Sequence, residues 1–160
     1  MHPASVKLSA WLLSSALTGA LLVQAQAELK TQLVVIGSGP AGLGAAIYSG
    51  RANTDTLVIE GQTPGGQPTK AGVIQNWPGT MEIAGPDLVE NMREHAGKNG
   101  AQFVSATVTS VDFSKPPFTI QLSNQQTVKA QAVVIATGAK PTLSKVPGEE
   151  QYLGSGVAFC

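Results

Sequence analysis

Cysteine, histidine and charge are scarce in this sequence of 160 residues. It contains one cysteine, Cys160, and two histidines, His2 and His95. A lone cysteine excludes an internal disulfide framework and cannot supply a zinc site, and two histidines give metal catalysis few ligands, so we expect no metal site. Only 12% of the residues are charged and the formal net charge is zero. This excludes the basic surface that a nucleic-acid partner needs, and also an acidic tail.

The first 27 residues differ from the rest of the chain. Lys7 is their only Lys or Arg, residues 8–23 are mostly apolar, and Ala25-Gln26-Ala27 has the small-x-small form of a cleavage site. We therefore predict a signal peptide over residues 1–27, export to the periplasm or the cell exterior, and no stable membrane span after cleavage. An uncleaved anchor is the alternative, although this apolar stretch is shorter than the roughly 20 residues of a span. A cytoplasmic location would follow if the leader were misread.

The remaining residues are organised around positions 33–46, which read LVVIGSGPAGLGAA. The apolar run 33–36 is typical of a strand buried on both faces, and a G-x-G-x-x-G turn and a helix over 41–52 follow it. In a βαβ unit the first glycine (Gly37) permits a sharp turn, the second (Gly39) lets the backbone approach a pyrophosphate, and the third (Gly42) lets helix and strand pack closely. The motif could arise by chance among 18 glycines, but this context favours a nucleotide site over a glycine turn without a ligand.

A second predicted strand, 56–59, ends in Glu60, which lies 23 positions after Gly37. This is near the offset of roughly 20 residues at which an acidic residue accepts hydrogen bonds from a ribose. A long Gly- and Pro-rich loop over 61–80 follows. The sequence then predicts a helix over residues 87–98 and strands over 102–111, 118–122, 127–130 and 132–135. The last strand runs into an Ala-Thr-Gly-Ala turn, which is either a ligand contact or a plain strand exit.

Together these segments resemble the low-molecular-weight thioredoxin reductases, flavoproteins of the pyridine nucleotide-disulfide oxidoreductase class. The matching motifs are GSGPAG at 37–42, RAN at 51–53, GGQ at 65–67, NWPG at 76–79, GP at 85–86 and ATGA at 136–139. The first and last of the glycine motifs occur widely among flavoproteins, whereas GGQ followed by NWPG at this spacing is much more specific. The resemblance implies an α/β fold: a Rossmann-like FAD-binding domain over residues 28–160, with a parallel sheet and an added antiparallel β-meander.

The resemblance also implies that FAD is the bound dinucleotide. The glycines of the first turn would admit the pyrophosphate, Glu60 would bind the adenosine ribose, and the GGQ loop would contact the flavin half. Asn76 would lie beside the isoalloxazine, the backbone of Val108 would lie near the adenine, and the ATGA turn would close over the cofactor. The implied FAD contacts are Gly37, Ser38, Gly39, Pro40, Ala41, Gly42, Glu60, Gly61, Gly65, Gly66, Gln67, Asn76, Val108, Ala136, Thr137, Gly138 and Ala139.

Cys160 resembles the first cysteine of the C-x-x-C pair of these reductases, the catalytic thiol that attacks a thioredoxin-like disulfide protein. One thiol cannot complete that exchange, because a second must resolve the mixed disulfide. We therefore expect the front portion of a longer reductase, incomplete in its sheet. A further domain would bind NADPH, and the full-length protein would be a homodimer. The purified mature chain, 28–160, should show weak or no retained flavin absorbance and oxidise no NADPH. The alternatives are a non-catalytic dinucleotide-binding remnant and another related flavoprotein reductase.

Overall fold

A computed structural model describes residues 28–158 of the chain. The predicted signal peptide, 1–27, and the predicted catalytic residue, Cys160, both lie outside the described residues. The elements, in chain order, are β1 (Glu28–Ile36), α1 (Pro40–Arg51), β2 (Thr56–Ile59), η1 (Gln67–Lys70), β3 (Val73–Ile74), β4 (Ile83–Ala84), α2 (Gly85–Lys98), β5 (Gln102–Val104), β6 (Val108–Asp112), β7 (Phe118–Leu122), β8 (Thr127–Ile135) and α3 (Glu149–Tyr152).

Six of the strands form one sheet in the order β5-β2-β1-β8-β7-β6. The first four strands are parallel, and β8, β7 and β6 are joined antiparallel as a meander. The two long strands, β1 and β8, pair along most of their length, from Glu28 with Thr127 to Ile36 with Ile135. The predicted parallel sheet with an added meander is therefore confirmed, and β8 is the strand that belongs to both parts.

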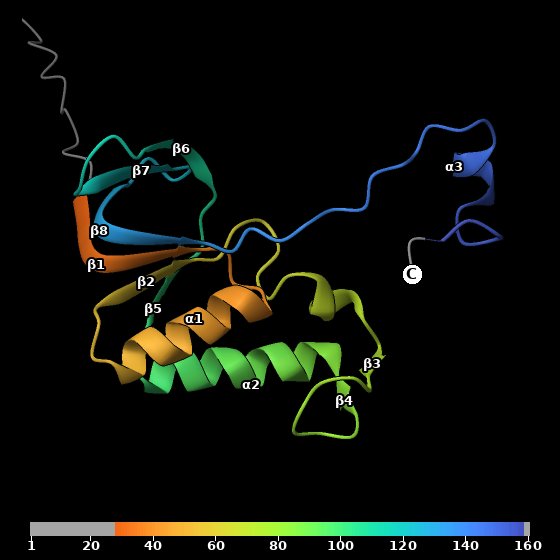
Figure 1. The fold of residues 1–160 in the computed structure, drawn as a ribbon, viewed down its shortest axis with the longest axis horizontal. Helices are drawn as coiled ribbons and strands as arrows, with labels where there is room; N and C mark the ends of the chain where they lie inside the picture. The colour runs from red at the N-terminus through yellow and green to blue at the C-terminus, as the bar shows by residue number, and fades with distance from the viewer. Residues whose placement is uncertain (1–27, 159–160) are drawn as a thin grey trace, which may run out of the picture.

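Hydrophobic side chains pack on both faces of the parallel strands, because successive residues of a strand point to opposite sides. Figure 1 shows the two helices α1 and α2 along one face and the meander strands β6 and β7 across the other. The core on the helix side contains Val35, Ala46, Ile47, Val58, Ala96 and Ala101. The core on the meander side contains Val34, Ile36, Leu57, Ile59, Ala106, Ile120, Leu122, Val128 and Ala130.

The small residues of α1 let it pack closely against its neighbours. Gly42, Ala46 and Gly50 are all buried, and a Cβ built on Gly50 would lie 2.5 Å from the backbone oxygen of Asn99, just beyond α2. The amphipathic helix α2 buries Leu88 and Ala96, and Ala96 belongs to the helix-side core. None of the helices within residues 28–158 is both long and apolar enough to cross a membrane.

Predicted strand boundaries were wrong in three places. β1 begins at Glu28 rather than at residue 33, because its first residues pair with β8. The segment 102–111 is not one strand, because Ser105–Thr107 turns the chain out of the parallel sheet and into the meander, with the amide of Ala106 bonding the carbonyl of Val104 at 3.1 Å. Residues 127–130 and 132–135 are one strand, because β8 passes from the meander to the parallel sheet without a break at Gln131.

Beyond β8, the chain runs away from the sheet to the short helix α3 (Figure 1).

Candidate functional site

Three loops predicted to bind a cofactor meet at one edge of the sheet. They follow the carboxyl ends of β1, β2 and β8, which are neighbours in the parallel sheet. The amide of Gly37 donates to Ile59 O at 2.9 Å, and the amide of Ala136 donates to Ile36 O at 2.9 Å. The loops after β2 and β8 are joined by the side chain of Gln67, which donates through Nε2 to Ala139 O at 3.2 Å. Ligands bind at this edge in open α/β sheets.

Close backbone contacts explain the first and third glycines of the turn. Gly37 has a φ of +109°, and a Cβ there would overlap the carbonyl oxygen of Ala136. A Cβ on Gly42 would overlap the carbonyl oxygen of Gly37 and lie 2.9 Å from its carbonyl carbon. Both positions exclude a side chain because protein backbone already occupies the space, as the sequence predicted for a tight turn and a closely packed helix.

The second glycine, by contrast, has room for a side-chain carbon. A Cβ on Gly39 would meet only Gly65 O at 3.9 Å and the Cα of Gly66 at 4.0 Å among the described residues. Gly39 is the N-cap of α1, and no side chain within residues 28–158 caps this end of the helix. The helix N-terminus therefore has free N–H groups and a partial positive charge beside an uncrowded glycine. These features fit the pyrophosphate of a dinucleotide.

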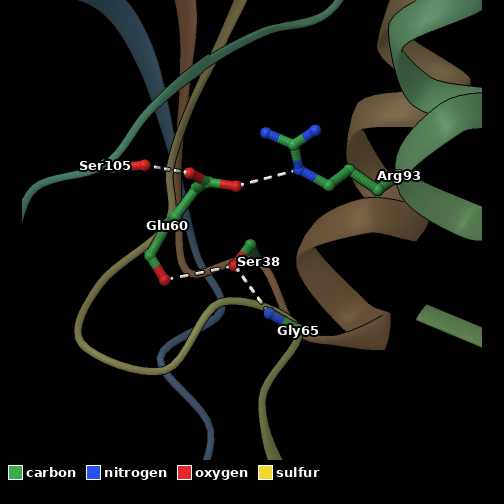
Figure 2. Close-up of polar contacts among 5 residues, drawn as sticks. All are labelled: Ser38, Glu60, Gly65, Arg93 and Ser105. Carbon is green, nitrogen blue, oxygen red and sulfur yellow. Dashed lines mark hydrogen bonds and ion pairs between the residues drawn. The ribbon is translucent and has the colours of Figure 1, made fainter. Parts of the chain in front are cut away.

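Ser38, which was predicted to contact the cofactor, links two of the loops. Its side chain is buried, and its hydroxyl donates to Glu60 O at 3.1 Å and accepts from the amide of Gly65 at 3.1 Å. Figure 2 shows this hydroxyl between the two backbone groups. The hydroxyl thus holds the glycine turn, the end of β2 and the GGQ loop in a fixed arrangement.

The carboxylate of Glu60 is held by two side chains from other elements (Figure 2). Arg93 of α2 donates from Nε to Oε1 at 3.0 Å, and Ser105 donates from Oγ to Oε2 at 2.5 Å. The Glu60 side chain is 4% exposed and that of Arg93 is 41% exposed. The guanidinium of Arg93 also lies over the ring of Phe103, with 4.4 Å between its central carbon and the ring centroid. Three segments far apart in the sequence, around residues 60, 93 and 103–105, therefore meet at the end of β2.

The backbone of Glu60 lies beside the glycine turn, where its carbonyl accepts from Ser38, whereas its carboxylate is bonded to Arg93 and Ser105. Each of its carboxylate oxygens accepts one hydrogen bond from the protein, and a carboxylate oxygen has two lone-pair sites. Both oxygens thus have acceptor capacity left for a sugar hydroxyl. Binding of the ribose by Glu60 stays a prediction.

Two predicted contact residues lie outside the loop cluster. Asn76 is exposed in the turn between β3 and β4. Val108 begins β6, pairs with Leu122 and is half-buried against the meander-side core. The structure therefore brings together the turn at 37–42, Glu60 and Gly61, the GGQ loop and the ATGA turn, and the roles of Asn76 and Val108 stay predictions.

Arg93 and Ser105 were missed by the sequence reading. Arg93 lies on a helix that also carries His95 and Lys98, and Ser105 lies in a segment that was read as mid-strand. A buried acidic residue at the end of a strand needs a counter-charge, but nothing in the sequence pattern marks which basic residue supplies it. The described residues thus offer backbone amides, which can bind an anion, and an oriented carboxylate, which can accept a hydrogen bond from a hydroxyl.

Comparison with known proteins gives a consistent result. A family model described as "Pyridine nucleotide-disulphide oxidoreductase" matches residues 31–160. The chain is 39% identical to a thioredoxin reductase of Rickettsia bellii, over 83% of this chain and 43% of that protein. It is 40% identical to a protein of Pseudomonas fluorescens named glucosaminate ammonia-lyase, over 81% of this chain and 41% of that protein.

A solved structure shares the fold. The crystal structure of thioredoxin reductase from Streptococcus pyogenes has a TM-score of 0.71 and 35% sequence identity, and the match covers 84% of this chain and 44% of that one. The chain thus spans about two-fifths of the length of the curated relatives it matches.

Proposed function

The chain belongs to the pyridine nucleotide-disulphide oxidoreductase family, and we propose that residues 28–160 form an FAD-binding domain. The observation that carries this proposal is the meeting of three loops at the N-terminus of α1, where no described side chain caps the helix and Gly39 has room for a Cβ. In the proposed complex the pyrophosphate lies against this N-terminus, and the adenosine ribose lies beside Glu60. The flavin half lies along the loops at 65–67 and 136–139, which Gln67 joins.

In the proposed reaction the whole protein is a thioredoxin-disulfide reductase that passes electrons from NADPH, through FAD, to a dithiol. The flavin supplies the ability to accept a hydride and to release its electrons to a disulfide. The described residues bind and orient the cofactor. In this proposal Cys160 is the thiol that exchanges with a thioredoxin-like disulfide protein, and NADPH binds outside residues 28–158. The reductases among the relatives and solved structures support this assignment.

A second candidate is the dinucleotide-binding portion of another enzyme in the family. The relative named as an ammonia-lyase is 40% identical to this chain, about as similar as the relatives named as reductases. Dinucleotide binding is common to both candidates. The two differ in whether Cys160 takes part in thiol–disulfide exchange, which alkylation of that thiol in the active full-length protein would test.

We further propose export through residues 1–27 and a homodimer for the full-length protein. The leader composition supports export. Fractionation of expressing cells would test the first proposal, and a size measurement in solution would test the second.

FAD titration tests the binding proposal directly. The purified full chain should bind FAD with 1:1 saturation and a Kd below about 100 μM, equivalent to more than about 5.5 kcal/mol. We expect titratable binding rather than cofactor retained through purification. Quenching of flavin fluorescence is the measurement, and no saturable binding in this range would overturn the proposal.

A matched pair of variants makes the titration specific to the pyrophosphate position. Gly39 has an ordinary φ of −72° and only distant neighbours around its Cβ position. Gly39→Val should therefore fold but place a side chain where the pyrophosphate would lie. We expect it to lose FAD binding, while the control Gly44→Ala, on the next turn of the same helix, keeps it. A folded Gly39→Val chain with wild-type affinity would contradict this placement of the cofactor.

A further inference from the structure

The fold holds the carboxylate of Glu60 in one orientation. It is almost fully buried, and its two oxygens are bonded by groups from different elements, Nε of Arg93 at 3.0 Å and Oγ of Ser105 at 2.5 Å. Two bonds to opposite oxygens fix both the position of the carboxylate and the plane in which it lies. The remaining lone pairs then point in set directions, whichever ligand arrives.

The backbone of the same residue is tied to the cofactor loops. Ser38, in the glycine turn, donates to Glu60 O and accepts from the amide of Gly65. The amide of Glu60 donates to Val104 O at 3.0 Å, next to Ser105. The carboxylate is therefore held at a constant place relative to the N-terminus of α1, where an anion would bind.

Arg93 is itself held in place. Its guanidinium lies over the ring of Phe103 on β5, with 4.4 Å between the guanidinium carbon and the ring centroid. Cations over aromatic faces are attracted by the ring quadrupole, so the guanidinium keeps its orientation although the side chain is 41% exposed. A stacked planar guanidinium is rigid where a free lysine would be mobile.

We propose that Arg93 and Ser105 are positioning residues for recognition of the adenosine ribose. They orient the Glu60 carboxylate so that it accepts a hydrogen bond from the 2′-hydroxyl, and they are the reason that the site distinguishes a ribose from a 2′-deoxyribose. This inference rests on the proposed dinucleotide site. It differs from a purely structural role for the ion pair, which would stabilise the fold without affecting the choice of sugar.

The test compares the affinity of the full chain for ADP and for 2′-deoxy-ADP. ADP carries the pyrophosphate and the adenosine of FAD, and the second probe lacks only the hydroxyl in question. A hydrogen bond to a charged group gives wild-type protein at least a tenfold preference for ADP. Isothermal titration of wild type, Arg93→Met, Arg93→Lys and Ser105→Ala, with Lys98→Met as control, measures this preference.

Arg93→Met should reduce the preference to about twofold, because an unpaired carboxylate is no longer held in one orientation. Arg93→Lys keeps the positive charge but loses the stacked planar guanidinium, so it should retain only part of the preference, between the values of wild type and Arg93→Met. Ser105→Ala, a mild change at an exposed position, should reduce it to about threefold. The control removes a cation from the same helix, in an exposed pair with Glu94 at 3.4 Å, and should leave the preference unchanged.

Each remaining outcome counts against a stated claim. If the variants weaken ADP and 2′-deoxy-ADP equally, the ion pair is structural only and the inference is wrong, while the dinucleotide site stands. The same holds if wild-type protein binds both probes equally. If wild-type protein binds neither FAD nor ADP, the proposed function itself fails, and the inference fails with it. Ser105→Ala decides the matter if both Arg93 variants fail to fold.

Discussion

Replacing Gly42 by alanine is expected to destabilise this chain, although alanine is normally the better residue inside a helix. Gly42 lies in α1, and a Cβ there would overlap the carbonyl oxygen of Gly37. It would also lie 2.9 Å from the Gly37 carbonyl carbon and 3.3 Å from Cγ1 of Val35. The valine could turn aside, but Gly37 is anchored at the end of β1 by the bond from its amide to Ile59 O. The added methyl group must therefore push α1 away from the sheet.

The size of the effect follows from two opposing contributions. Forcing an extra methyl group into packed backbone costs about 1–3 kcal/mol. Because the neighbouring atoms at Gly42 are backbone, we expect the cost there to lie at the upper end of this range. The higher helix propensity of alanine offsets about 1 kcal/mol of this cost. The net change in the free energy of unfolding is thus about 2 kcal/mol of destabilisation for Gly42→Ala.

Gly44 provides the matched control on the same helix. No described atom that could clash lies within 4 Å of its Cβ position, so Gly44→Ala has only the favourable contribution. We expect it to stabilise the chain by about 0.4–1 kcal/mol. Two glycines, two positions apart in one helix, should therefore change stability in opposite directions.

Urea denaturation followed by circular dichroism measures both variants. With a slope of about 2 kcal/mol per molar urea, Gly42→Ala should lower the midpoint by about 1 M, and Gly44→Ala should raise it slightly. A Gly42→Ala midpoint at or above that of wild type would refute the close packing of α1 against the first turn. An equal loss in both variants would show that the helix as a whole, rather than one contact, tolerates no alanine.

Two further predictions concern the loop before α3 and the meander-side core. The backbone amide of Ser144, followed by other backbone amides of the same loop, holds the pKa of Glu149 below its ordinary value of 4.5. The ionised form is thus favoured by folding, so the stability that it contributes is present above pH 4.5 and is lost as the pH falls through the lowered pKa. The NMR shift of the Ser144 amide should titrate with a midpoint below pH 4.5, and this titration should be absent in Glu149→Gln. A midpoint at or above pH 4.5 would contradict the hydrogen bonds from the loop amides to the Glu149 carboxylate. Ile120 is fully buried and Ile135 is 65% exposed, so Ile120→Ala should cost about 2–5 kcal/mol in unfolding free energy, and Ile135→Ala less than about 0.5 kcal/mol. Urea denaturation of the two variants checks this, and equal losses would show that the meander does not share a core with the parallel strands.

The sequence alone was sufficient for the first strand–turn–helix unit and for β2, although it missed residues 28–32 of β1. A run of four apolar residues, the glycine turn and the small-residue helix predict strand, turn and helix, because each depends on neighbours along the chain. β2 was predicted with its observed bounds, 56–59. The same local patterns carried the family resemblance, which the family match over 31–160 confirms.

Strand boundaries in the second half needed the tertiary structure. The sequence reading made one strand of 102–111 and two of 127–135, and both were wrong. The turn at Ser105–Thr107 exists because the end of β2 pairs with it, through the bond from the amide of Gly61 to Ala106 O at 3.0 Å. β8 stays unbroken because β1 pairs with both of its halves. Neither partner is adjacent in sequence, so no local pattern shows them.

Within the site, the sequence by itself determined where the glycine turn and Glu60 lie along the chain, and the tertiary structure decided how Glu60 is held. Position and residue type identified Glu60 as an acidic residue at the end of a strand. Its partners, Arg93 and Ser105, lie 33 and 45 residues further along the chain. The physical reason is that a turn or a helix start depends on the residues that form it, whereas the counter-charge of a buried carboxylate depends on which elements pack beside it.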